Sequence, residues 1–355
     1  MKFAGYPDVQ SDLTEVRFET LRNLVDLANV RKCDLFVVAG DLFDRISVAK
    51  KDIVQAAQIL NEFQGNLVIV LPGNHDFFSV GDDTLWAYFR SKGPGILVLD
   101  EAKTYSLKHY DLDVCLYGAP CTAKHSDQNA VGWVHAVRRD RSIKYHIGIA
   151  HGSLEGVSPD FDKRYYPMTT DELLACRLDV WLLGHTHMQY PASPGEGDKI
   201  FYSATPEPDG FDCTHEGKAW LIELDEAQIN SESVSTGRYR FVHEEFRLNS
   251  EADLDGIRSR YSSSDYSQTL MKVKVSGCLP SDIYGNVRQL GRDIRSCFKY
   301  LEFGDSDVSE GITLDDINRL FTEGSVPHKL LSALAKEDDS EALQLAYDLL
   351  TEVNK

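Results

Sequence analysis

The sequence predicts an α/β fold in which strands buried on both faces alternate with amphipathic helices. Two continuous apolar runs of strand length, 35–39 and 67–71, have the composition of parallel strands. Between them, apolar residues recur at helical spacing from Ile53 to Phe63, and Gly65 follows in a position favoured after helices. Strand, helix and strand with short connections form a βαβ unit, whose crossover we expect to be right-handed.

The neighbouring elements follow from two patterns, apolar residues at helical spacing and short apolar or alternating runs. In chain order they are a helix over 14–30, a short helix over 85–89, a strand over 96–99, a hairpin of 104–107 with 114–118, a helix over 130–137, a strand over 145–150, a helix from Thr170 and a strand over 180–183. Side chains that can cap a helix precede several of them, namely Asp12 or Thr14, Ser47, Asp83 and Thr170.

The rest of the chain shows strand-like segments and then a second alternation. Strands are expected at 199–203, 218–224 and 239–248, with a Ser-rich link at 231–237. The pattern behind the link reads helix (252–261), strand (270–275), helix (283–294) and strand (300–303), followed by a helical tail. We therefore expect a domain of residues 1–240, a small α+β domain of residues 241–305 and a helical segment of residues 306–355 that packs on its own domain.

Composition and charge narrow the class of protein. The chain has 355 residues and a formal net charge of −19, which argues against a broad phosphate-binding surface, because sequence-independent DNA affinity comes from many Lys and Arg contacts. Binding of nucleic acid remains possible, since a carboxylate-rich pocket collects divalent cations that invert the local electric field.

The apolar runs are too short to cross a bilayer and no signal-peptide core follows Met1, so we expect a cytoplasmic protein with no membrane segment. The seven cysteines are scattered and odd in number, which favours buried thiols over a disulfide framework or a zinc knuckle.

Four of the expected strands end in polar residues that a hydrophobic core would exclude. Because ligands of α/β sheets collect at the carboxyl ends of the strands, these residues are expected to build one site. They are Asp41, Asn74, His75, Asp76, His151, His185 and His187. A carboxylate, an amide oxygen and three or four imidazoles suit manganese, iron or zinc, whereas magnesium or calcium would take nearly all oxygen. Two ions are favoured over one, because a single carboxylate, here Asp41, can bridge ions about 3.5 to 4 Å apart that activate a water near neutral pH.

Other polar residues are interpreted as supporting or structural. Asp76 is expected to support an imidazole from outside the metal shell, and Asp44 and Arg45 to support the Asp41 loop. A lone histidine is more often a satisfied core or surface residue than a ligand. That interpretation applies to His109, His125 and His146.

The segments 39–44, 73–76, 150–153 and 184–187 together resemble the calcineurin-like metallophosphoesterases, in which the same motifs occur in the same order. They read Ala-Gly-Asp-Leu-Phe-Asp, Gly-Asn-His-Asp, Ala-His-Gly-Ser and Gly-His-Thr-His. The Gly-Asp-Leu-Phe-Asp motif and the later Tyr-Ser-Ala-Thr-Pro-Glu at 202–207 are similar to the DNA-repair exonuclease branch of the family, the SbcD type. The resemblance covers about residues 13–245 and, more loosely, the α+β module.

This resemblance implies a βαβ-rich sandwich of two sheets with helices on the outside, followed by a small α+β capping domain that faces DNA. It implies that Asp41 bridges two ions, and that Asn74, His151 and His185 complete the second ion's ligands. His187 would bind the first ion. The resemblance also implies dependence on Mn²⁺, with Fe²⁺ or Zn²⁺ as alternatives, a homodimer, and a partner ATPase of the coiled-coil SMC-like class.

The candidate catalytic residues are His75 and its neighbour Asp76, and the resemblance implies the role of His75. His75 would protonate the leaving oxygen or steady the scissile phosphate rather than bind metal.

One motif of the family has no clear counterpart. The family opens with a strand that ends in Asp-x-His, whose side chains fill the first metal site. Residues 1–4 are too short for a central strand, and Gly5-Tyr6-Pro7 interrupts them. Asp8-Val9-Gln10 keeps the spacing but lacks the imidazole and lies just before a helix. We expect the strand and its motif to be absent from this sequence, either lost or omitted, with Asp8 and Gln10 as the less favoured surviving ligand pair. If the motif is lost, the first ion keeps only Asp41 and His187.

The leading hypothesis is a metal-dependent DNA exonuclease or endonuclease in DNA repair, which uses two metal ions and an activated water on a phosphodiester. A calcineurin-like phosphatase or phosphodiesterase for a small substrate is the second hypothesis, favoured by the acidic charge and opposed by the C-terminal module. The third is a catalytically impaired structural partner of an SMC-like ATPase, favoured by the missing Asp-x-His pair.

Overall fold

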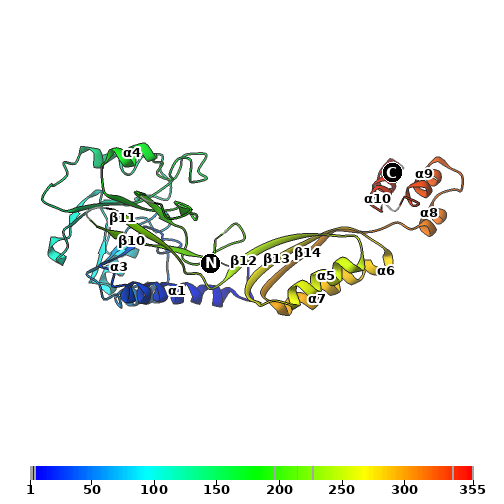
Figure 1. Ribbon diagram of the computed structural model, residues 1–355, viewed down its shortest axis with the longest axis horizontal. Helices are drawn as coiled ribbons and strands as arrows, with labels where there is room; N and C mark the ends of the chain where they lie inside the picture. The colour runs from blue at the N-terminus through cyan, green and yellow to red at the C-terminus, as the bar shows by residue number, and fades with distance from the viewer. Residues whose placement is uncertain are drawn as a thin grey trace. The chain divides into compact units, whose positions relative to one another are not determined.

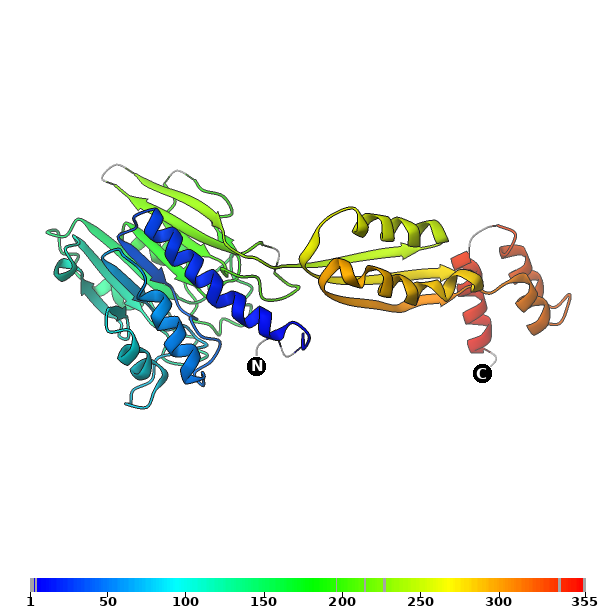
Figure 2. The same ribbon diagram turned by 90° about the horizontal axis from the view of Figure 1, so that it is seen from below.

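The computed structural model describes residues 3, 5–195, 197–213, 215–225, 228–337 and 340–353. The chain divides into two compact units, the first of residues 1–209 with 213–238 and the second of residues 210–212 with 239–355 (Figures 1 and 2).

Three parallel strands form the first sheet of the first unit, in the order β1 (Leu35–Val38), β2 (Leu67–Val70) and β3 (Ile96–Val98). The helices α1 (Gln10–Val30), α2 (Lys50–Leu60) and α3 (Leu85–Lys92) supply the buried side chains of its outer face, and α1 and α2 lie side by side (Figure 2). β1 and β2 pair in parallel with Leu35 opposite Leu67, so the predicted βαβ unit is confirmed.

Six strands form the second sheet, in the order β4-β5-β6-β7-β9-β8. Their bounds are β4 (Lys103–Ser106), β5 (Val114–Ala119), β6 (Tyr145–His151), β7 (Val180–Gly184), β8 (Gln189–Tyr190) and β9 (Ile200–Ser203). β5, β6, β7 and β9 are mutually parallel, while β4 pairs antiparallel with β5 as the predicted hairpin. The 3₁₀ helix η1 (Lys108–Tyr110) lies in this hairpin.

The two sheets pack face to face around a shared core. Ile69 of β2, Leu116 of β5, Ile149 of β6 and Phe201 of β9 belong to this core and are almost completely buried. The 3₁₀ helix η2 (Gly132–Ala136) and α4 (Thr170–Ala175) supply residues to the core on the outer face of the larger sheet. The predicted α/β sandwich with outer helices is therefore confirmed.

A Ser-rich segment expected to be a link is instead a strand. β11 (Ile229–Ser235) pairs antiparallel with β10 (Lys218–Leu224) along its whole length. Ser231 and Ser233 lie opposite Ile222 and Trp220. The prediction was wrong because it relied on serine content, whereas small side chains that alternate along a strand fit beside large cross-strand neighbours.

Helix starts also differ from the expected caps. α1 begins at Gln10 and α2 at Lys50, and neither has a side-chain cap. Thr84 rather than Asp83 caps α3, and Thr169 rather than Thr170 forms a capping box with Glu172 at α4. In place of the helix expected over 130–137, the structure has the short 3₁₀ helix η2 (Gly132–Ala136).

The second unit contains a sheet of three parallel strands in the order β12 (Arg240–Leu248), β13 (Tyr266–Leu279) and β14 (Phe298–Glu310). The connections contain α5 (Glu251–Ser262), α6 (Ser281–Tyr284), α7 (Asn286–Ile294) and η3 (Arg295–Cys297). Figure 1 shows α5 and α7 on one face of this sheet, where Leu254, Ile257 and Leu290 are buried. β14 extends to Glu310, past the domain boundary expected at residue 305.

The tail forms three further helices, α8 (Leu314–Leu320), α9 (Val326–Leu334) and α10 (Ser340–Val353). Ile317, Leu331 and Leu343 make a small core among them. Within the described part of the chain, every helix falls short of the length and hydropathy that a bilayer span requires. All seven cysteines are free thiols, of which three are buried.

Candidate metal centre

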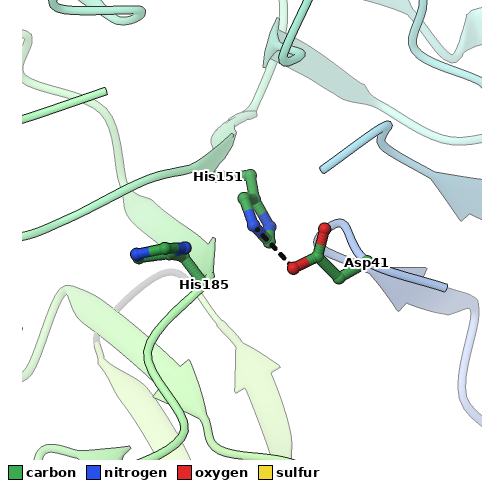
Figure 3. Close-up of side chains that lie close together, drawn as sticks. All are labelled: Asp41, His151 and His185. Carbon is green, nitrogen blue, oxygen red and sulfur yellow. Dashed lines mark ion pairs between the residues drawn. The ribbon is translucent and has the colours of Figure 1, made fainter. Parts of the chain in front are cut away.

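Side chains from four strand ends meet at one edge of the sandwich. Asp41 follows β1, Asn74 follows β2, His151 ends β6 and His185 follows β7. Ligand atoms of Asp41, His151 and His185 all lie within 4.8 Å of one another, and Figure 3 shows the Asp41 carboxylate beside the His151 ring. Among the described residues this is the one such group of three or more His, Cys, Asp or Glu side chains.

Asn74 joins this group through its amide oxygen. Its Oδ1 lies 2.9 Å from His151 Nε2 and 3.2 Å from His185 Nδ1. Its Nδ2 donates to the carbonyl of Lys124 over 3.4 Å, which turns the oxygen rather than the NH₂ group toward the imidazoles. The side chain is 1% exposed, so the amide is held in a dry position.

The hydrogen-bonding pattern of His151 indicates that a proton or a metal ion lies beside its Nε2. Its Nδ1 lies 2.9 Å from the Ala39 carbonyl and donates to it, which leaves the lone pair on Nε2. That lone pair faces two oxygens that can only accept, Asp41 Oδ2 at 3.2 Å and Asn74 Oδ1 at 2.9 Å. A proton or a metal ion must lie among these three atoms for the arrangement to be favourable.

The spacing of the donor atoms fits a transition metal. Atoms bound about 2.0 to 2.2 Å from a tetrahedral ion lie roughly 3.4 Å from one another. His151 Nε2 lies 3.2 Å from Asp41 Oδ2 and 2.9 Å from Asn74 Oδ1, and His185 Nδ1 lies 3.2 Å from Asn74 Oδ1, which is close to that spacing. One carboxylate oxygen, one amide oxygen and two imidazole nitrogens also form the mixed donor set that suits zinc, iron or manganese.

The electrostatics of the site keep Asp41 ionised and His185 neutral, and they favour a proton on His151 that a metal ion would displace. Burial acts to raise the pKa of Asp41, but the charge of His151 and hydrogen bonds from His151 and the His75 N–H prevail and hold that pKa at about 2. Burial, followed by the charge on His151, lowers the pKa of His185 to about 4. Burial acts to lower the pKa of His151, but the charge of Asp41 outweighs it and raises that pKa. A carboxylate and a neutral imidazole therefore face the space that a cation would fill.

Three motif glycines allow this close packing. Gly40 has φ +96°, and a Cβ there would overlap the His151 ring. A Cβ on Gly73 would overlap the backbone and carboxylate of Asp41, and one on Gly184 would overlap the Ala39 carbonyl. The glycines are needed because the strand ends approach one another without room for a methyl group.

Two site residues have strained backbone. Asp41 has φ +53° and His185 has φ +104°, a region that residues with a Cβ adopt only at a cost in free energy. Both residues carry the donor atoms described above. The inference is that the fold tolerates this strain in order to aim those side chains.

Asp76 occupies a different position from the one expected. Its carboxylate accepts the N–H of Phe43 at 3.0 Å and of Gly73 at 2.7 Å, rather than an imidazole N–H. Burial, and next the charge of Asp41, raise the pKa of Asp76 to about 7. Asp76 therefore ties the loop after β1 to the loop after β2.

His75 lies next to the centre but is exposed. Its backbone N–H donates to Asp41 Oδ1 at 2.8 Å, and its ring Nδ1 lies 3.1 Å from the Asp44 carbonyl. This bond leaves Nε2 as the ring nitrogen that can meet a substrate. The Asp44 side chain pairs with Arg45 at 2.8 Å, as a local support of this loop.

His187 and the Asp8–Gln10 segment stand apart from the group. The His187 side chain is 52% exposed, and its Nδ1 lies 3.6 Å from Asp209 Oδ1. Gln10 begins α1 and is not behind a strand. Neither Asp8 nor His187 is a member of the group around His151.

Several contributors to the site could not be found from residue type. The carbonyls of Ala39 and Lys124 orient two donor side chains, and no sequence pattern identifies an orienting carbonyl. The ring of Tyr165 lies 4.9 Å from that of His185 and 5.1 Å from that of His125. Tyr165 lies in the loop 158–168, which is rich in Pro, Asp and Tyr. That composition suggests a functional loop but does not identify which of its residues contribute to the site.

The Tyr-Ser-Ala-Thr-Pro-Glu motif at 202–207 stabilises the fold near the site. The hydroxyl of Tyr202 donates to the Gly152 carbonyl at 2.8 Å, directly behind His151. The buried carboxylate of Glu207 accepts from the Thr20 hydroxyl at 2.8 Å and from the Arg238 N–H at 2.9 Å. The motif thus supports the loop after β6 and ties α1 to the end of the first unit.

Comparison with known proteins agrees with this geometry. The family model for calcineurin-like phosphoesterases matches residues 1–189, which contain Asp41, Asn74, His151 and His185. The uncharacterized metallophosphoesterase YhaO of Bacillus subtilis (strain 168) is 26% identical over 225 residues, or 62% of this chain and 52% of that protein. The chain thus spans about half the length of this curated relative. Since the family match covers more than half of the sequence, the chain belongs to the calcineurin-like phosphoesterases, a family of hydrolases that act on phosphoric esters with divalent metals.

Proposed function

We propose that this chain is a metal-dependent phosphodiesterase that hydrolyses DNA, with Mn²⁺ as its metal. The observation that carries the metal-dependent part is the convergence of Asp41, Asn74, His151 and His185, whose oxygen and nitrogen atoms form a mixed donor set at one point. Family membership supports hydrolysis of a phosphoric ester. The substrate and the metal are parts of the proposal.

The side chains around the centre would divide the work by their chemistry. Asp41, Asn74, His151 and His185 would hold the ion, which when bound polarises the phosphoryl oxygen and acidifies a water. His75 would carry a proton on Nε2 to the leaving oxygen or bind the scissile phosphate. Its Nδ1 bond to the Asp44 carbonyl fixes the ring for that task.

A second ion would use Asp41 again, with His187 as its other ligand from this chain. Two observations support His187 as a ligand of this second ion. It lies two residues after His185, and the carboxylate of Asp209 is 3.6 Å from its Nδ1. Its exposure is consistent with an open ion that substrate approaches. In this proposal Asp41 is the shared carboxylate of a two-metal site.

DNA is the proposed substrate because the motifs at 39–44 and 202–207 resemble the DNA-repair exonuclease branch, and because a separate second unit follows the catalytic one. A role in repair, a homodimer and an SMC-like ATPase partner belong to the same proposal. The net charge of −19 favours the competing candidate, a small phosphoester substrate, since a small molecule needs no basic surface.

The test compares substrates under one set of conditions. Purified protein with Mn²⁺ is incubated with single-stranded DNA, duplex DNA and bis(p-nitrophenyl) phosphate, with EDTA controls. We expect DNA cleavage that EDTA abolishes and that Asp41→Asn removes. The matched control is Asp111→Asn, an exposed residue away from the centre, which should cleave normally. Cleavage of the ester without cleavage of DNA would support the small-substrate function, and no cleavage of either would contradict both.

A further inference from the structure

A second pocket lies at the opposite ends of the strands that carry His151 and His185. It has a volume of about 340 Å³ and is lined by residues of η2 and of the connection to β6, and by the end of α4 with the two residues that follow it. These segments precede the first residues of β6 and β7, whereas the metal centre follows the last ones. β6 has seven residues, so the two sites are separated by about 20 Å of strand.

The pocket is basic in a protein that is strongly acidic. Arg139, Arg141, Arg177 and His135 line it, and none of the described residues that line it is acidic. The chain as a whole carries 37 Lys and Arg against 56 Asp and Glu. Three guanidinium groups around one small cavity therefore give it a positive charge that differs from the negative charge of the whole chain.

Arg139 is a fixed part of the wall. Its Nη2 donates to both carboxylate oxygens of Asp179, at 3.1 and 2.9 Å, and its Nη1 donates to the Arg177 carbonyl at 2.8 Å. Asp179 also accepts the His146 N–H at 2.7 Å. Asp179 thus neutralises Arg139 and has little capacity left for another cation.

Arg141 and Arg177, unlike Arg139, are not neutralised by a carboxylate. Both are exposed, and neither forms an ion pair with any residue that the structure describes. Guanidinium groups match the geometry of phosphate oxygens and bind them through paired, charge-assisted hydrogen bonds. Two uncompensated guanidiniums beside a fixed third one suit a phosphate dianion.

Backbone strain gives an independent indication. Arg177 follows the end of α4 with φ +56°, the left-handed conformation that glycine normally supplies at this position. An arginine there costs free energy that a glycine would not. Residues with such backbone strain cluster at functional sites, so the strain supports a role for Arg177.

The remaining wall is apolar and sets the class of ligand. Val134 and Val137 line the pocket beside the arginines. The pocket volume is at the lower end of the range for small organic ligands. We propose that this pocket binds a small phosphomonoester, such as a nucleoside monophosphate, with the phosphate on Arg141 and Arg177 and the organic part on the valines.

The test uses isothermal titration of the Asp41→Asn protein in EDTA, so that the metal centre cannot hold the anion. The probes are AMP, inorganic phosphate and adenosine. We expect AMP to bind more tightly than phosphate, and adenosine not to bind. An Arg141→Ala, Arg177→Ala double variant should weaken AMP binding by at least about tenfold, since charge-assisted hydrogen bonds are the strong ones. Arg138→Ala, on the same loop but outside the pocket lining, is the control and should bind AMP normally.

Arg177→Gly separates binding from folding. It should raise the melting temperature, because glycine relieves the left-handed conformation, and it should weaken AMP binding. Absence of AMP binding, equal binding by the double variant, or equal weakening by Arg138→Ala would overturn the proposal. Binding of a DNA duplex that the double variant loses, without any AMP binding, would also overturn it and would assign these arginines to DNA phosphates.

Discussion

Two histidines at opposite ends of β6 are equally buried but differ in what they need. His146 is 0% exposed and His151 is 1% exposed. His146 has one partner for each nitrogen, the Tyr117 hydroxyl at 2.9 Å from Nδ1 and the Ile143 carbonyl at 3.1 Å from Nε2. A neutral ring that accepts from the hydroxyl and donates to the carbonyl satisfies both.

His151 has too many acceptors for a neutral ring. A carbonyl faces its Nδ1, while a carboxylate oxygen and an amide oxygen face its Nε2. The comparison teaches that burial does not distinguish a candidate metal-binding histidine from a core histidine. The balance of donors and acceptors around the ring does.

The largest expected effect separates these two histidines directly. His151→Ala should lower Mn²⁺ affinity by more than about 100-fold, because loss of a ligand should exceed the 10- to 100-fold cost of losing an outer-shell partner. His146→Gln should leave the metal content unchanged, since Gln keeps a donor for the Ile143 carbonyl. Metal content after gel filtration is the measurement. Equal loss from both variants would mean that donor balance does not identify the ligand.

A second prediction tests the close packing at the metal end. Gly184→Ala should destabilise the protein by about 1 to 3 kcal/mol, since an added methyl group overlaps the Ala39 carbonyl and forces a backbone shift. The control is Gly132→Ala, where nothing lies within 4 Å of an added Cβ. Urea unfolding of both variants gives the comparison. A Gly184→Ala variant as stable as Gly132→Ala would show that the strand ends have room to move.

A third prediction concerns His75. His75→Ala should lower kcat by about 10² to 10⁴, the usual contribution of a general acid, with metal content intact. Its ring contacts the Asp44 carbonyl rather than the group around His151, so its loss removes no donor atom. His109→Ala, an exposed histidine elsewhere in the first unit, serves as the control. Loss of metal from His75→Ala would contradict the assigned role.

The smallest expected effect is a pH dependence from His146. Burial, followed by the charge of Arg139, lowers the pKa of His146 below its ordinary value of 6.5. The unfolded chain therefore binds the proton first, so the stabilisation is complete above about pH 6.5 and is lost as the pH falls toward the folded-state pKa.

Urea unfolding between about pH 8 and pH 5.5 measures this term as the difference between wild type and His146→Gln. The variant should lose less stability on acidification than the wild type does. An identical loss in both proteins would show that His146 titrates as it does in the unfolded chain.

Much of the architecture and part of the site could be predicted from the sequence. Apolar runs predicted the strands, and the strand-end rule placed Asp41, Asn74, His151 and His185 together. These four residues end a strand or lie within four residues of its end, so the sheet brings them to one edge. The sequence could not place His187, because beyond a strand end the backbone direction depends on local conformation, here the positive φ of His185.

Other features depended on information that residue type does not carry. β11 was missed because its serines are compatible with a strand only when a partner such as Trp220 lies opposite. Asp76 was assigned to an imidazole because its neighbour is a histidine, although its carboxylate turns toward two backbone N–H groups. Both errors concern contacts with other segments or with the backbone, which the pattern of side chains along one segment does not reveal.

The position of Asp76 bears on how the protein acquires its metal. One carboxylate accepts the peptide N–H groups of Phe43 and Gly73, so the two loops that present Asp41 and Asn74 are held together by hydrogen bonds within the chain. We therefore expect a preorganised site that binds a cation with little rearrangement. Exchange of one divalent ion for another should leave the surrounding chain in place.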